Sequence, residues 1–134
     1  MKLNIFLGQL LLMATLGITA VYACDCSDTT PSKEFNRSKV VFIGEYIGLD
    51  KEDKTLFLIK KSWKGVKANN TLSLYYLDIL GCDYDLKLIK GEKYLIYAIS
   101  NKGELLIPVD CGRTRSLAQA KKDLKELGKP ISSQ

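Results

Sequence analysis

The residues with the clearest chemical potential are four cysteines: Cys24, Cys26, Cys82 and Cys111. The first two stand one residue apart in the run Cys24-Asp25-Cys26, whereas the other two are isolated. The chain has no histidine, and this spacing does not match the paired ligands of a structural zinc site. The cysteines therefore predict disulfide bonds formed in an oxidising compartment, and no intrinsic metal or other cofactor.

Simple geometry limits how these cysteines can pair. Cys24 and Cys26 are too close along the chain to bond each other without severe strain. Each is therefore expected to bond to Cys82 or to Cys111. Two pairings remain open on this argument.

The residues before Cys24 have the pattern of a secretory signal peptide. Lys2 precedes a long apolar stretch that ends in Val21-Tyr22-Ala23, which predicts a signal over residues 1–23 with cleavage after Ala23. Residues 24–134 are then a single secreted domain. Two alternatives are an uncleaved membrane anchor and a bacterial lipoprotein signal, which would attach a lipid to Cys24.

Composition argues against several functional classes. Without histidine there is no serine or cysteine triad, and the acidic residues are scattered through turns such as 50–53 and 83–85, so we expect no enzyme. The net charge is +5, with both signs mixed along the chain. Such a weak excess does not favour nucleic-acid or membrane binding, so a membrane is expected as a partner only if Cys24 carries lipid.

The scaffold that must position the cysteines is expected to be mainly β. Five segments rich in branched and aromatic residues are bounded by polar or glycine-containing turns, and the first two should pair antiparallel. These predicted strands are Lys39–Ile47, Thr55–Trp63, Thr71–Leu77, Lys93–Ile99 and Glu104–Val109.

Helical spacing appears at the end of the chain. A capping box of Ser116 and Gln119 should start this helix, and Gly128 with Pro130 should end it. A short helix is also expected over Pro31–Arg37. Together these elements predict a five-stranded Greek-key barrel of the oligonucleotide/oligosaccharide-binding (OB) type, with the C-terminal helix covering one side of the sheet. The apolar positions of that helix are Leu117, Ala120, Leu124 and Leu127.

Tyrosines on the expected strands could stack with bases in a barrel of this type. The neighbours Tyr75 and Tyr76 point to opposite faces of a strand, however, and secretion separates the domain from nucleic acid. We expect the four tyrosines to pack in the core or on the surface: Tyr75, Tyr76, Tyr94 and Tyr97.

Several short motifs follow one another in a specific order along residues 24–128. They are Cys-x-Cys at the mature terminus, Pro31 and Phe35, Val40-Val41-Phe42-Ile43-Gly44, Trp63-Lys64-Gly65, the lone Cys82, Gly91-Glu92-Lys93-Tyr94-Leu95-Ile96, and Cys111. In these motifs the chain resembles the N-terminal domain of the tissue inhibitors of metalloproteinases, within the netrin-like superfamily. Asn36 stands where the animal inhibitors have a further cysteine, so the resemblance is to a minimal, single-domain member.

The resemblance implies one of the two open pairings, Cys24 with Cys82 and Cys26 with Cys111. It also implies that the mature terminus forms a rigid wedge that enters the active site of a secreted zinc metalloprotease. The α-amine and carbonyl of Cys24 would chelate the catalytic zinc of that protease, and Asp25 would enter its specificity pocket. Leu80 and Gly81 would line the cleft beside Cys82.

The expected function is therefore inhibition of a metalloprotease by a monomeric protein, with zinc present only in the complex. The alternative is a non-inhibitory netrin-like module with a binding or structural role. In that case Cys24 could serve as a lipid anchor.

Overall fold

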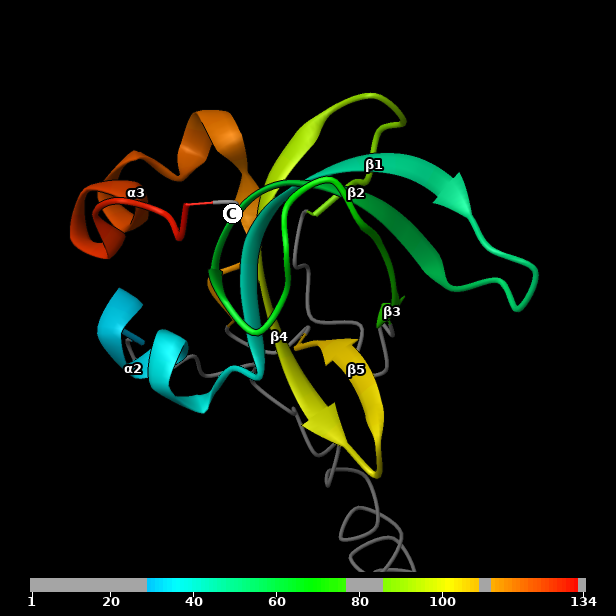
Figure 1. Ribbon diagram of the computed structural model, residues 1–134, viewed down its shortest axis with the longest axis horizontal. Helices are drawn as coiled ribbons and strands as arrows, with labels where there is room; N and C mark the ends of the chain where they lie inside the picture. Colours follow the sequence, from blue (N-terminus) through cyan, green and yellow to red (C-terminus); the bar gives the residue numbers. More distant parts are fainter. Residues whose placement is uncertain (1–28, 77–85, 109–111, 133–134) are drawn as a thin grey trace, which may run out of the picture.

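A curled sheet dominates the computed structural model, which describes residues 29–76, 86–108 and 112–132 (Figure 1). The strand order is β1-β2-β3-β5-β4-β6, and β1 also pairs with β4. This additional pairing closes the first five strands into a barrel, which confirms the predicted fold. The strands are β1 (Val40–Leu49), β2 (Thr55–Lys64), β3 (Thr71–Tyr76), β4 (Lys93–Asn101), β5 (Glu104–Ile107) and β6 (Arg115–Ser116).

The pairing directions are those of an OB-type barrel. β1 is antiparallel to both β2 and β4, and β2 is antiparallel to β3. β3 and β5 run parallel, with Tyr75 opposite Leu106 and Tyr76 opposite Ile107. The sixth strand, β6, was not predicted; it is two residues long and pairs with the first half of β4, where Tyr94 lies opposite Ser116.

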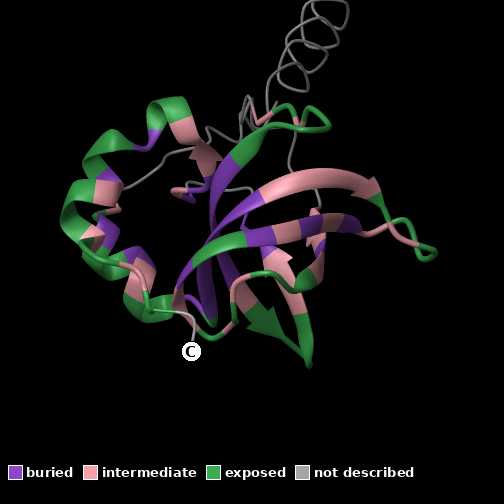
Figure 2. Cartoon of the chain, turned by 45° about the horizontal axis from the view of Figure 1, so that its top comes forward, coloured by how far each residue is buried: buried purple, intermediate pink, exposed green. Residues whose placement is uncertain are grey.

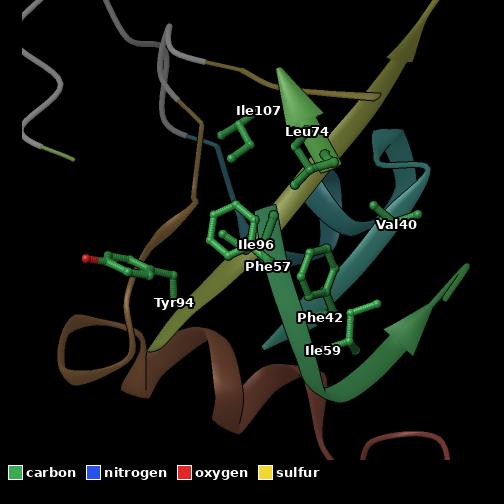
Figure 3. Close-up of a cluster of buried hydrophobic side chains, with 9 residues drawn as sticks. Val40, Phe42, Phe57, Ile59, Leu74, Tyr94, Ile96 and Ile107 are labelled. Carbon is green, nitrogen blue, oxygen red and sulfur yellow. The ribbon is translucent and has the colours of Figure 1, made fainter. Parts of the chain in front are cut away.

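The barrel interior is filled by apolar side chains from every strand of the closed ring (Figure 3). The rings of Phe42 and Phe57 meet edge to face, with centroids 6.2 Å apart, a favourable arrangement for two aromatic quadrupoles. Alternation along β2 sends Phe57 and Ile59 inward. The buried members of this cluster are Val40, Phe42, Phe57, Ile59, Leu74, Tyr94, Ile96, Ala98 and Ile107.

A second core lies outside the barrel, between the sheet and the helices. Val41 and Ile43 of β1 alternate with the inward residues, and they are buried with Leu95, Tyr97 and Ala120. The covering elements are α2 (Pro31–Arg37), the 3₁₀ turn η1 (Leu117–Gln119) and α3 (Lys121–Leu127). The first half of β1 and residues 94–98 of β4 are buried on both faces, which agrees with their nearly continuous apolar sequences (Figure 2).

The first predicted helix is confirmed, with the same bounds. Thr30 precedes it, and the Thr30 side chain accepts a hydrogen bond from the Lys33 amide, which satisfies one of the free amides of the first turn. Pro31 occupies the first turn, where the missing N–H of proline costs nothing. At the other end the Ser38 hydroxyl donates to the Glu34 carbonyl at 2.6 Å.

The predicted start of the C-terminal helix was wrong. Ser116 makes no side-chain capping bond, because its backbone belongs to β6 and pairs with Tyr94. The turn η1 follows, and the α-helix begins only at Lys121. Its predicted end at Gly128 is confirmed, since Gly128 adopts φ 69° as the C-cap residue.

Among the described residues no helix has both the length and the apolar character needed to cross a membrane.

Candidate functional site

The residues of the predicted inhibitory wedge lie outside the described residues. The two disulfides and their pairing therefore stay predictions. The structure does describe the residues that flank these segments, and their arrangement defines the candidate site. The residues concerned are Cys24, Asp25, Cys26, Leu80, Gly81, Cys82 and Cys111.

The segments that contain Cys82 and Cys111 both follow strands that end at the same edge of the barrel. Because β3 and β5 are parallel, their last residues Tyr76 and Ile107 lie opposite each other. The Tyr76 hydroxyl donates a hydrogen bond to the carbonyl of Leu86 at 3.1 Å. This bond joins the residues on either side of positions 77–85.

Pro108 and Gly112 are similarly close on either side of positions 109–111. A Cβ atom placed on Gly112 would lie 2.7 Å from the Pro108 carbonyl oxygen, nearer than two such atoms can approach without displacement of the backbone. Only a residue without a side chain fits this position undisturbed. Glycine at 112 therefore allows the chain beside Cys111 to stay close to the end of β5.

The N-terminal segment reaches the same region through Arg113. The Arg113 guanidinium donates from Nη1 to the carbonyl oxygen of Thr29 at 2.7 Å. Thr29 lies three residues after Cys26, and Arg113 lies two residues after Cys111. A described hydrogen bond thus links the chain that follows Cys26 to the chain that follows Cys111.

Arg113 is itself held by a buried carboxylate on α3. Its Nε donates to Asp123 Oδ2 at 2.7 Å, and its Nη2 donates to Asp123 Oδ1 at 2.6 Å. The Tyr97 hydroxyl also donates to Asp123 Oδ2, at 2.9 Å. Asp123 is fully buried and the Arg113 side chain is only 11% exposed. The bidentate geometry is the strongest and most directional form of a carboxylate–guanidinium pair.

The electrostatics of this network follow from burial and hydrogen bonding. Burial alone would raise the pKa of Asp123, but hydrogen bonds from Arg113 and Tyr97 favour the ionised form and hold the pKa below its usual value. The hydrogen bond to Asp123 raises the pKa of Arg113. Burial, followed by the hydrogen bond to Asp123, raises the pKa of the Tyr97 hydroxyl far above its normal range. The network is therefore a fixed ion pair at neutral pH, with a neutral tyrosine beside it.

Thr114 fixes the next residue of this segment to β4. Its hydroxyl oxygen accepts from the Tyr97 amide at 2.9 Å and donates to the Tyr97 carbonyl at 3.2 Å. The threonine side chain thus pairs with the backbone of β4 between the stretches that pair with β5 and β6. Residues 114–116 are consequently attached to β4 at successive positions.

The helix that follows Thr29 carries a second buried carboxylate. Glu34 is fully buried and forms an ion pair with Arg37 of the same helix, with Arg37 Nη2 at 2.9 Å from Glu34 Oε1. A second bond joins Arg37 Nε to Glu34 Oε2, also at 2.9 Å. The same guanidinium thus compensates the buried charge, although only Oε2 accepts a hydrogen bond from it.

The described contacts of this region hold separate segments of the chain together. The two buried carboxylates, Asp123 and Glu34, are paired with Arg113 and Arg37. Within residues 29–76, 86–108 and 112–132 no group of three or more His, Cys, Asp or Glu side chains could hold a metal ion. What the arrangement does is join the segments after Cys26 and Cys111 through Arg113, and the two flanks of positions 77–85 through Tyr76. These are the segments that adjoin the four cysteines.

Sequence reasoning missed Arg113 and Asp123. The available signal was the position of Asp123, which lies on the apolar stripe of α3 between Ala120 and Leu127. A carboxylate on the buried face of a helix requires a partner. The sequence could indicate that need, but nothing in it identified Arg113 as the partner.

The sequence matches no protein-family model and no curated protein.

Proposed function

We propose that the mature chain is a secreted inhibitor of a zinc metalloprotease and that it acts through a free N-terminal Cys24. The proposal combines the predicted cleavage after Ala23, the Cys-x-Cys run at the new terminus and the OB-type barrel. The observation that carries it is the hydrogen bond between Arg113 and the Thr29 carbonyl. This bond ties the chain next to the predicted wedge to a buried part of the domain.

The chemistry of such a terminus is simple. A catalytic zinc keeps one coordination position for water, and a neutral α-amine with the adjacent carbonyl oxygen can form a five-membered chelate in its place. A free α-amine has a pKa of about 7.7–8.0, so the neutral form is accessible near neutral pH. Zinc favours the deprotonated form further. A terminus already held in place loses less conformational entropy on binding.

The described contacts also support the proposed disulfide pairing. Thr29 and Arg113 are in direct contact, and three residues of extended chain span about 10 Å at most. Cys26 and Cys111 thus lie three and two residues before two residues that are in contact. This agrees with the proposed bond between Cys26 and Cys111, and Cys24 would then pair with Cys82.

The direct test is inhibition by the oxidised, correctly processed protein against a panel of secreted zinc proteases. We expect at least one protease to be inhibited, and we expect a variant with one extra alanine before Cys24 to lose that inhibition. The extra residue replaces the amine by an amide nitrogen, which cannot act as the ligand. The denaturation midpoint of the extended variant serves as the control for folding. Equal inhibition by both proteins would refute the wedge mechanism.

The alternative is a lipid-anchored, non-inhibitory module, and one sequence feature favours it. Ala23-Cys24 is preceded by an aliphatic Val21, as in lipoprotein signals. Intact-mass analysis of the mature protein separates the two proposals. An unmodified Cys24 is expected for the inhibitor, whereas a diacylglyceryl group and an acylated amine would exclude zinc chelation by that nitrogen.

A further inference from the structure

The Arg113 side chain makes two kinds of contact. Two of its nitrogens, Nε and Nη2, bind the carboxylate of Asp123 on α3. The third, Nη1, binds the backbone carbonyl of Thr29, far away in the sequence and close to the predicted wedge. One planar group therefore connects the last helix of the domain to its N-terminal segment.

The first contact orients the second. A guanidinium is flat, so the two bonds to Asp123 fix the direction in which Nη1 points. Asp123 is buried from solvent, and its two direct bonds to Arg113 are sufficient to fix the plane of the guanidinium. An ammonium group at the same position would keep the charge but could not hold both carboxylate oxygens and the carbonyl in this planar arrangement.

We propose that Arg113 is a positioning residue for the N-terminal wedge, which it holds in its binding direction by anchoring the Thr29 carbonyl to Asp123. This inference rests on the proposed inhibitory function. It assigns to one side chain outside the wedge the task of fixing the wedge relative to the barrel. Loss of this anchor should weaken inhibition even while the domain stays folded, because the terminus must then lose more freedom on binding.

The test compares two substitutions in the same network. Arg113→Lys keeps the positive charge beside Asp123 but loses the planar fork, including the bond to Thr29. Tyr97→Phe removes one hydrogen bond to Asp123 while Arg113 keeps all three of its bonds. For the full mature protein, we would measure the inhibition constant against a sensitive zinc protease, the denaturation midpoint, and amide hydrogen exchange in the peptide up to Thr30.

We expect Arg113→Lys to raise the inhibition constant about tenfold, as for the loss of one charged hydrogen bond. Exchange in the N-terminal peptide should accelerate in the same variant. Tyr97→Phe should lower stability yet leave the inhibition constant and the exchange of this peptide unchanged. If both variants weaken inhibition in proportion to their loss of stability, or if Arg113→Lys leaves it unchanged, the positioning role is wrong.

Two further measures keep the test decisive. If Arg113→Lys does not fold, the double variant Arg113→Met with Asp123→Leu removes both buried charges, a replacement that buried ion pairs tolerate. It should show the same weakened inhibition and faster exchange. If the wild-type protein inhibits no zinc protease, the proposed function fails by itself. The anchor is then judged on hydrogen exchange alone, and equal exchange in all variants would overturn it.

Discussion

The Tyr97 hydroxyl donates a hydrogen bond to Asp123 Oδ2 across 2.9 Å and so connects the middle of β4 to the last helix. Both side chains are buried between the barrel and the helices that cover it. The sheet and its helical layer are therefore joined by a polar bond in addition to apolar packing. This bond can be tested separately from the anchor at Arg113.

Tyr97→Phe should lower the free energy of unfolding by about 1–3 kcal/mol, because a buried carboxylate oxygen loses one of its two donors. Urea denaturation followed by circular dichroism would measure the change. Tyr75→Phe is the matched control, since the ring stays available for its contact with the Lys54 ammonium, 4.6 Å from the centroid. A loss as large in the control would show that the Asp123 bond is not the cause.

Asp123 should make the stability of the domain depend on acid pH. Its pKa in the folded protein is held below the normal value, so the unfolded chain binds the proton more readily than the folded protein does. The stabilisation is thus complete above the unfolded-state pKa of about 3.9 and is lost as pH falls through the lower folded-state value.

The measurement is the urea concentration at the midpoint of unfolding, determined at several pH values between pH 2 and pH 7 for the wild type and for Asp123→Asn. The variant should be less stable at neutral pH by about 3–5 kcal/mol, because Arg113 is left as an uncompensated buried charge. Its midpoint should also change less with pH below about 4. Parallel pH profiles for the two proteins would assign the acid sensitivity to other carboxylates.

Gly112→Ala should destabilise the domain because its Cβ would lie 2.7 Å from the Pro108 carbonyl oxygen. Overpacking of this kind costs about 1–3 kcal/mol, and each kcal/mol lowers the melting temperature by about 4–8 °C in a domain of 60–100 residues. Gly103→Asn is the control: nothing lies within 4 Å of its Cβ, and asparagine tolerates positive φ. Equal melting temperatures for wild type and Gly112→Ala would show that the backbone adjusts freely.

The disulfide pairing is open to direct mapping. Non-reducing digestion and mass spectrometry should recover Cys24 with Cys82 and Cys26 with Cys111. With Cys24–Cys82 kept, replacing both Cys26 and Cys111 by serine opens a loop of about 30 residues by the shortest covalent path and should cost about 4 kcal/mol on the chain-entropy model. Recovery of Cys24 with Cys111 would contradict both the proposed pairing and the wedge built on it.

Under the proposed inhibitory mechanism, Asp25 is expected to limit the range of target proteases. An unpaired carboxylate in an apolar specificity pocket costs several kcal/mol, so Asp25→Thr should strengthen inhibition of proteases with apolar pockets. The inhibition constants of the two proteins against one such protease measure this. A protease with a basic group in its pocket is the control, since there the substitution should weaken binding.

The sequence predicted the barrel because its strands have simple local signatures. The run from Val40 to Ile43 is apolar at every position, and the structure buries one face of it in the barrel and the other under the helices. Pro108 ends β5 where the pattern alone predicted a strand to Val109, since proline has no N–H for the sheet. Val109 itself lies outside the described residues.

The site was harder to predict, because its bonds join residues that are distant in the chain. Ser116 resembled a helix cap, yet pairing with Tyr94 kept it in a strand. Nothing in the local sequence distinguishes Arg113 from other basic residues, and its role depends on the tertiary contacts with Thr29 and Asp123. Local patterns indicate periodicity and turns, whereas such partnerships depend on the tertiary arrangement.

The parallel pairing of β3 with β5 also has a consequence for the order of folding. The barrel closes through Tyr76 and Ile107, and through the pairing of β1 with β4, so the decisive contacts are non-local and closure should be slow compared with that of helical domains. Until β4 and β5 have left the ribosome, β1 and β3 have edges without partners. The nascent chain is then most exposed to intermolecular strand pairing, which makes the period before β4 and β5 are available the stage at which aggregation would begin.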